Sequence, residues 1–403
     1  MLYIFISVYA IYTLFELVLH TLEFNFVKAK KDGKSVILND DEFKNAATAT
    51  LEKLKFKIFS LIYSFFVLLF WLFLGLNFLK IIFEGDGQTS QIALFTCFLL
   101  ANAIISLPLD IYEKFVLDKK LGFSTITPKI FIIDNIKSFI ILALFGSLGA
   151  MIFALCYTYF SLWWLWAFVI SFGIILLINL IYPTIIAPLF NKMTPLENEE
   201  LKSSILSLLE ACGFKSSGVF VMDASKRDNR LNAYFGGLGA TKRVVLFDTL
   251  INKLSKDEII AVLGHELGHF KHKDLLKNII FMGLMLFIFF AILGALNYDI
   301  YGILDLGDTP IALLIFFLLF SPILSAFFMP LMSALSRKAE FGADNFGAAR
   351  TSANMMISAL KKLGSENKAF PLSHPLFSFV YHSHPSLFER IKTLENENLA
   401  NHR

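Results

Sequence analysis

The sequence is poor in charged residues. Only 17% of its 403 residues are Asp, Glu, Lys or Arg, whereas soluble globular domains carry about a quarter. Apolar residues make up 56%, there are 45 phenylalanines, and the mean hydropathy is +0.65. This composition argues against a soluble protein and predicts several membrane-spanning helices.

Cysteine is also scarce. Cys97, Cys156 and Cys212 lie far apart and form no CxxC pair, which argues against a disulfide framework and against a cysteine-bound metal. The net charge of +3 and the lack of a long basic block indicate no nucleic-acid partner. The N-terminus lacks the basic region and small-residue cleavage site of a secretory signal, so we expect its first apolar stretch to be retained as a span.

Seven apolar stretches are long enough to cross a bilayer, which takes about 20 helical residues. Glu16 and His20 interrupt the first of them. We expect spans at residues 2–22, 58–83, 91–109, 138–157, 162–184, 277–297 and 309–333.

The connecting loops fall into two classes by charge. Segments 84–90, 158–161 and 298–308 contain no Lys or Arg, whereas loop 28–57 contains eight lysines. The two classes alternate along the chain, and basic loops stay on the cytoplasmic side. We therefore expect a multi-pass protein (of the cytoplasmic membrane in a bacterial host) with its N-terminus outside and its large polar segments in the cytoplasm.

This pattern divides the chain into four regions. Residues 1–184 hold spans 1–5, residues 185–276 form a polar segment, residues 277–333 hold spans 6–7, and residues 334–403 form a polar C-terminal segment.

The polar segment 185–276 has the pattern of a small α/β unit. Residues 195–212 place Leu and Ile at helical spacing, and the short apolar runs 217–222 and 242–247 predict strands. In the C-terminal segment we expect a helix over 333–349, followed by a looser region containing Pro371, Pro375 and Pro385.

A further helix is expected to begin at Ser255, a suitable N-cap, and to carry His265-Glu266-Leu267-Gly268-His269. His265 and His269 are four residues apart, so they share one helical face and can hold one metal ion. Glu266 then lies close enough to take a proton from a zinc-activated water. The HExxH pattern is specific, although a chance match on a surface helix is the alternative. The flanking Gly264 permits close packing beside the ligands, which favours a metal site.

Catalytic zinc usually has three protein ligands and one open position. Glu340 and Asp344 stand four residues apart directly after the last span. Glu340 is the candidate third ligand, and Asp344 is suited to orienting an imidazole from behind. The alternatives are a solvated charged helix face for this pair, and His272 as the ligand. His272 ranks lower because a single straight helix rarely offers three imidazoles to one tetrahedral ion.

Three further histidines lie near the C-terminus. His374, His382 and His384 are typical of surface loops. His384, followed by Pro385, is nevertheless a candidate donor to a tetrahedral oxyanion, a charge that appears only in the transition state.

Taken in order, these motifs resemble the CAAX prenyl protease type I family, which are multi-span HExxH zinc peptidases with a downstream Glu ligand. The matching pieces are Pro183, Ala187-Pro188-Leu189-Phe190-Asn191, Ser225-Lys226-Arg227, Asn232-Ala233-Tyr234-Phe235, Lys242-Arg243, Asp248-Thr249-Leu250, Gly264 to His269, Ser336-Arg337 with Glu340, Ala343-Asp344, His384-Pro385 and Glu389-Arg390.

The resemblance implies a mainly α fold. About seven transmembrane helices would enclose a water-filled chamber, closed on the cytoplasmic side by a zinc-metallopeptidase α+β domain. It implies one Zn²⁺ per chain, held by His265, His269 and Glu340, with Glu266 activating the water.

The resemblance also implies roles for residues around the metal. Asn232, Ala233 and Tyr234 would form an edge strand that pairs with the substrate backbone, a general way to hold an extended peptide. Asp344, His384 and Arg390 match catalytic positions near the metal, where His384 and Arg390 would bind the oxyanion or support the ligands.

The expected activity is that of an integral-membrane zinc metalloendopeptidase resembling enzymes that remove C-terminal residues from prenylated peptides. The expected partners are peptide or protein substrates, including lipidated ones, and the lipid bilayer. The alternatives are a membrane-protein quality-control zinc protease, and a non-enzymatic transporter with structural zinc, which the nearly uncharged spans argue against. Two departures leave substrate preference open: the charged run 228–231, and Asp274 where family members often have a histidine.

Overall fold

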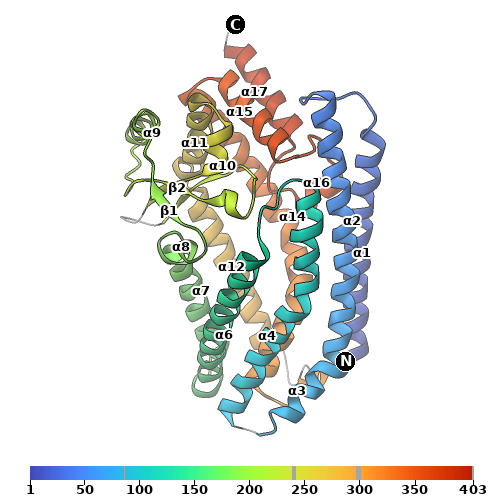
Figure 1. The fold of residues 1–403 in the computed structure, drawn as a ribbon. Coiled ribbons are helices and arrows are strands. Elements are labelled where there is room, and N and C mark those ends of the chain that lie inside the picture. Colours follow the sequence, from blue (N-terminus) through green and yellow to red (C-terminus); the bar gives the residue numbers. More distant parts are fainter. Residues whose placement is uncertain (86, 238–241, 296–300, 402–403) are drawn as a thin grey trace.

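The computed structural model describes residues 1–85, 87–237, 242–295 and 301–401. Its long apolar runs form long helices that lie side by side over most of the length of the molecule (Figure 1). They are α1 (Leu2–Lys30), α2 (Asp40–Phe70), α3 (Leu76–Ile82), α4 (Gln88–Tyr112), α6 (Pro128–Tyr159), α7 (Trp163–Ile181), α12 (Asp274–Ala295) and α14 (Pro310–Arg350).

Three π-helical turns continue these helices instead of ending them. The turn η1 (Trp71–Gly75) joins α2 to α3, η2 (Glu113–Leu117) joins α4 to α5 (Asp118–Lys120), and η3 (Tyr182–Ile186) joins α7 to α8 (Ala187–Phe190). Counted this way, the described residues contain seven helices long and apolar enough to span a membrane. All seven expected spans are confirmed, except that residues 296 and 297 of the sixth fall outside the described residues.

The last span differs from its expected form. The separate helix expected over 333–349 is the continuation of the span itself, because α14 runs unbroken from Pro310 to Arg350. No proline follows Pro330 in this helix, and α14 accommodates both Pro322 and Pro330 in its interior. Glu340 therefore lies on a direct continuation of a membrane helix.

A four-stranded sheet forms the β part of the polar segment. Its strands are β1 (Met193–Pro195), β2 (Val219–Met222), β3 (Ala233–Gly236) and β4 (Arg243–Phe247), in the order β1-β2-β4-β3. β2 and β4 are parallel, and the outer strands pair antiparallel. The two predicted strands are confirmed as β2 and β4. The three-residue β1, which ends in a proline, gave no strand pattern in the sequence.

Helices pack around this sheet to make the main hydrophobic core outside the membrane. They are α9 (Glu199–Ala211), α10 (Asp248–Lys253) and α11 (Lys256–Lys271), together with two helices from the C-terminal segment. Leu246, Leu250, Leu263 and Leu267 are fully buried in this core. The predicted amphipathic helix over 195–212 is confirmed as α9, which begins after the N-cap Asn198.

The looser region expected after residue 349 is wrong. The described chain forms α15 (Ala353–Glu366), α16 (Pro375–Tyr381) and α17 (Leu387–Asn401) there. The prolines precede or begin helices instead of breaking them, because a proline at the first helical position leaves no internal hydrogen bond unmade. Met356, Leu360, Ile391 and Leu394 anchor α15 and α17 in the main core.

The fold class is therefore as predicted: mainly helical, with seven membrane helices and a small α+β unit. The enclosed chamber stays a prediction of the family resemblance.

Candidate active site

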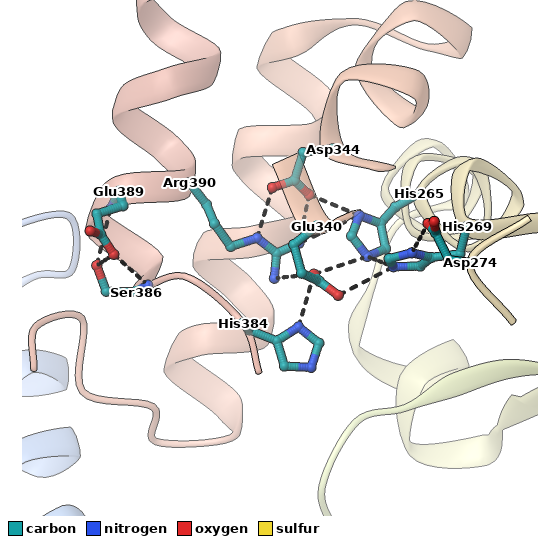
Figure 2. Close-up of polar contacts among 9 residues, drawn as sticks. All are labelled: His265, His269, Asp274, Glu340, Asp344, His384, Ser386, Glu389 and Arg390. Carbon is teal, nitrogen blue, oxygen red and sulfur yellow. Dashed lines mark hydrogen bonds and ion pairs between the residues drawn. The ribbon is translucent and has the colours of Figure 1, made fainter. Parts of the chain in front are cut away.

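The HExxH motif lies on α11, whose start is fixed by a capping box. The Ser255 hydroxyl accepts a hydrogen bond from the Glu258 backbone N–H, and the Glu258 carboxylate accepts one from the Ser255 backbone N–H. These two bonds satisfy N–H groups that a helix start leaves unpaired. The predicted N-cap is confirmed, and the helix presents His265 and His269 on one face (Figure 2).

Small residues allow α11 to approach α14 closely. A Cβ atom added to Gly268 would lie 2.8 Å from the Cα of Ala343, and one added to Gly347 would lie 2.8 Å from the backbone nitrogen of His265. A Cβ on Gly264 would lie 3.1 Å from the Cα of Gly347. Since no side chain separates the two backbones, the imidazoles of α11 reach the carboxylates of α14.

Three side chains from these helices converge on one point. His265 Nε2 and His269 Nε2 lie 3.3 Å apart. Glu340 places Oε1 3.2 Å from His269 Nε2 and Oε2 3.5 Å from His265 Nε2 (Figure 2). A tetrahedral zinc with ligands at about 2.0–2.2 Å separates them by roughly 3.3–3.6 Å. The donor set therefore fits one metal ion in both chemistry and spacing.

A carboxylate stands behind each imidazole. Asp344 Oδ1 lies 2.8 Å from His265 Nδ1, and Asp274 Oδ2 lies 3.1 Å from His269 Nδ1. Such partners fix the ring orientation and the tautomer that leaves Nε2 free for a metal. Asp344 was anticipated in this orienting position, but Asp274 was not.

Asp274 has no helical relationship to His269 that a sequence pattern reveals. It is five residues further on, beyond the end of α11, and begins α12. Lys273, with φ of 57°, turns the chain between the two helices. That turn brings the carboxylate back toward the imidazole.

The charges of this cluster affect His269 strongly. Burial lowers its pKa, but hydrogen bonding to Glu340 and Asp274 outweighs burial and raises the pKa of His269 to about 9. A metal ion binding to Nε2 must displace that proton, so metal binding releases a proton at neutral pH.

Arg390 and His384 complete the cluster from the C-terminal segment. Arg390 Nε and Nη2 donate to the two oxygens of Asp344 at 2.8 and 2.6 Å. His384 Nδ1 lies 2.8 Å from Glu340 Oε2, although its side chain is 61% exposed. The structure therefore brings both residues to the group around Glu340, as the resemblance implied (Figure 2).

Glu266 faces a small cavity of about 190 Å³ beside this cluster. Ala233, His265, His384 and Arg390 line the same cavity. Burial raises the pKa of the Glu266 carboxyl, although the two neighbouring imidazoles act in the opposite direction. A carboxylate with a raised pKa is suited to accept and return a proton near neutral pH.

The strand β3 borders the same cavity and lies at the edge of the sheet. Among the described strands it pairs only with β4, so its other edge has no strand partner. Asn232 and Ala233 line the cavity directly, and Tyr234 follows along the strand. Of the residues predicted to hold a substrate backbone, Ala233 and Tyr234 thus lie on an edge strand and Asn232 directly precedes it; Asn232 and Ala233 line the same cavity as Glu266.

The charged run before β3, residues 228–231, contacts the polar end of the third membrane helix and the loop that follows it. Arg230 Nη2 lies 2.5 Å from the buried Asp118, and Arg230 Nη1 lies 2.7 Å from Asp228. Asn229 N–H donates to the carbonyl of Phe123. These contacts account for the unusual charge of residues 228–231, because they attach the start of β3 to α5 and to the loop between α5 and α6.

The remaining candidate histidines are outside this group of three metal-binding side chains. His272 caps the end of α11 and is exposed, and the metal-binding group found among the described residues contains His265, His269 and Glu340 without it. His374 and His382 flank α16, where their backbone groups make the polar contacts described below.

Comparison with known proteins agrees with this geometry. Residues 195–398 match peptidase family M48, and residues 28–192 match the CAAX prenyl protease N-terminal domain of five membrane helices. Among curated relatives, a CAAX prenyl protease 1 homolog of Dictyostelium discoideum is 36% identical over 78% of this chain and 76% of its own length. The CAAX prenyl protease 1 homolog of Homo sapiens is 34% identical over 89% of this chain and 87% of its own length.

A solved structure shares the whole fold. The crystal structure of S. mikatae Ste24p superposes with a TM-score of 0.88 at 29% identity, covering 97% of this chain and 98% of that one. Fold and comparisons together define a multi-pass membrane protease that resembles the CAAX proteases. The chain belongs to peptidase family M48 and carries the membrane domain of CAAX prenyl proteases. Nothing in these findings supports the transporter alternative.

Proposed function

We propose that this protein is a zinc metalloendopeptidase that cleaves peptides held along β3. The observation that carries the proposal is the convergence of His265, His269 and Glu340 at tetrahedral spacing next to Glu266. Histidine and carboxylate donors with one open position are typical of catalytic zinc, and the M48 family itself implies a metal.

Each group in the cavity has a role in one-step hydrolysis. Bound zinc would polarise the scissile carbonyl and lower the pKa of water. Glu266 takes a proton from the attacking water and later gives it to the leaving amine. His384 and Arg390 supply positive charge and N–H donors where the carbonyl oxygen becomes anionic. Asp344 and Asp274 hold the two imidazoles in the orientation that directs each Nε2 toward the metal.

We further propose that the substrate is a lipidated peptide, the class named for the curated relatives. A cavity of about 600 Å³, lined by both charged and apolar side chains, borders His269 and Glu340. Phe281 also lines a second, apolar cavity of about 390 Å³ between α12 and α14, whose wall is built mainly from Phe, Met and Leu. An apolar cavity of this size next to one that carries the candidate metal ligands suits a ligand with a hydrocarbon chain and a peptide.

The charge pattern of the loops supports a cytoplasmic location for the zinc site, with the N-terminus on the other side of the membrane. A cysteine-labelling experiment on residues of the 28–34 loop and of the loop after α3, with a membrane-impermeant reagent on intact cells, tests this orientation.

The test of function compares the wild type with Glu266→Gln in detergent. Zinc content and cleavage of two substrates are measured, a farnesylated C-terminal peptide and its unmodified counterpart. We expect about one zinc per chain in both proteins and cleavage by the wild type alone. Preference for the farnesylated peptide supports prenyl processing, and equal cleavage supports general turnover of membrane proteins. Retained activity in Glu266→Gln, or no zinc in the wild type, overturns the proposal.

A further inference from the structure

His384 lies beside the candidate metal-binding residues, although burial does not hold it there. Its side chain is 61% exposed, yet its Nδ1 lies 2.8 Å from Glu340 Oε2. A cavity of about 470 Å³ separates parts of α14 from the segment that includes Ser373, Pro385 and Glu389. This cavity interrupts the packing of the segment against α14, where polar contacts connect the two.

The first anchor is Glu23 of α1, at the N-terminal end of α16. Its carboxylate is 3% exposed and accepts hydrogen bonds from the His374 backbone N–H at 2.7 Å and from the Ser373 hydroxyl at 3.2 Å. α16 has no side-chain cap of its own. A carboxylate from another helix thus satisfies the N-cap N–H, and its negative charge is favourable at a helix N-terminus.

The second anchor is Arg337 of α14, at the C-terminal end of α16. Its Nη1 donates to the carbonyls of Ser378 at 2.7 Å and His382 at 2.8 Å. The buried Ser333 hydroxyl, one helical turn earlier on α14, donates to Val380 O at 2.9 Å. These donors bind carbonyls of the last turn of α16, where a helix leaves carbonyls without internal partners; the Ser378 carbonyl also accepts the His382 backbone N–H.

Neither Glu23 nor Arg337 has a role in the proposed catalysis. Aromatic rings of α16, Phe377 and Tyr381, pack around the buried His20 of α1, with ring centroids 5.2 and 5.1 Å from it. His20 and Glu23 thus form a polar face of α1 directed at α16. Arg337 precedes Glu340 by three residues, so both lie on one face of α14.

We propose that Glu23 and Arg337 are positioning residues that clamp the two ends of α16 and thereby hold His384 against Glu340. The proposal rests on the proposed function only for the catalytic use of His384. Arg337 is especially well placed, because one rigid turn of α14 connects it to Glu340, and two residues connect His382 to His384. A one-ångström misplacement of such a group lowers a rate by about a hundredfold.

The first test needs no activity. Hydrogen–deuterium exchange is measured for the wild type, Glu23→Gln, Arg337→Met and Arg337→Lys, with Arg350→Met as a control on the same helix. We expect about tenfold faster exchange over residues 376–386 in Arg337→Met, partial restoration in Arg337→Lys, and unchanged exchange over α11. Unchanged exchange over 376–386 in both Glu23→Gln and Arg337→Met overturns the clamp.

The second test uses peptide cleavage and zinc content. Arg337→Met should keep its zinc and lower kcat by about tenfold to a hundredfold with KM within about twofold. In a His384→Ala background the same substitution should lower kcat little further, because the residue it positions is already gone. Equal losses in both backgrounds contradict positioning through His384.

The two tests separate this inference from the proposed function. A wild type that cleaves nothing refutes the proposed function, while faster exchange in Arg337→Met still supports the clamp. An active wild type with additive Arg337 and His384 effects refutes the inference alone.

Discussion

Asp274 Oδ2 lies 3.1 Å from Nδ1 of His269, so the first residue of α12 orients an imidazole of the candidate metal site at the end of α11. Asp344 does the same for His265 from α14. Each imidazole of the HExxH motif thus has a carboxylate behind it, and each carboxylate comes from a different membrane helix. The geometry of the metal site therefore depends on how α12 and α14 meet α11.

Replacing Asp274 by Ala should weaken metal binding. Loss of an orienting carboxylate typically lowers metal affinity by about 10–100-fold, because the ring is then free to rotate and is less basic. Competition with a fluorescent zinc chelator measures the affinity. Asp257→Ala, at the other end of α11, removes an equal charge far from the ligands and is the control. Equal affinity in wild type and Asp274→Ala would contradict the orienting role.

Replacing Gly347 by Ala should disturb the metal site through the backbone. The new Cβ would lie 2.8 Å from the backbone nitrogen of His265, so the two helices would have to shift apart. We expect a loss of about 1–3 kcal/mol in stability and a reduced zinc content. Thermal unfolding and metal analysis of purified protein measure both. Gly173→Ala in α7 is the matched control, because an added Cβ there meets no atom within 4 Å; similar losses in both variants would refute the close-packing argument.

Pairing of a substrate along the edge of β3 predicts that the rate of cleavage depends on backbone N–H groups of the substrate. Replacing a substrate amide next to the scissile bond by an ester removes an N–H donor without changing the side chains. The lost hydrogen bond is worth about 0.5–1.5 kcal/mol, which corresponds to a fall in kcat/KM of roughly 2–13-fold. An ester scan of the substrate, with a distant position as control, measures the effect. Uniform kinetics across the scan would exclude pairing along β3.

Glu258 predicts a pH dependence of stability at the start of α11. Burial raises its pKa, but hydrogen bonds from Ser255 and Ser358 and the charge of Lys362 outweigh burial and hold the pKa of Glu258 below its usual 4.5. A lowered folded-state pKa stabilises the fold above the unfolded value, and the stabilisation is lost as the pH falls through the folded value.

Glu258→Gln should therefore destabilise the protein at pH 7 by about 1–2 kcal/mol, and the difference should shrink below pH 4.5. Thermal unfolding of the two proteins across a pH series provides the measurement. Glu210→Gln, an exposed change on α9, serves as the control. A difference that grows on acidification would show that another interaction dominates.

The sequence by itself determined the features that depend on local periodicity and solvent. Runs of about 20 apolar residues can only be satisfied as helices within a bilayer, so all seven spans were predictable. The i,i+4 spacing of His265 and His269 and the cap at Ser255 are likewise local, because a helix fixes their relative positions. The residues also suggested Glu340, Asp344 and His384 as candidates with alternatives left open, and the ordered motifs added the family and, with it, Arg390.

Tertiary structure alone decided how these parts meet. Asp274 reaches His269 only through the turn at Lys273, which no periodicity reveals. The close approach of α11 to α14 depends on Gly264 facing Gly347 and on Gly268 facing Ala343, across two helices distant in sequence. The contacts of Glu23 and Arg337 with α16 likewise join residues that no sequence pattern connects. Such contacts join residues far apart in the chain, and their geometry is set by packing between helices rather than by the preferences of any one segment.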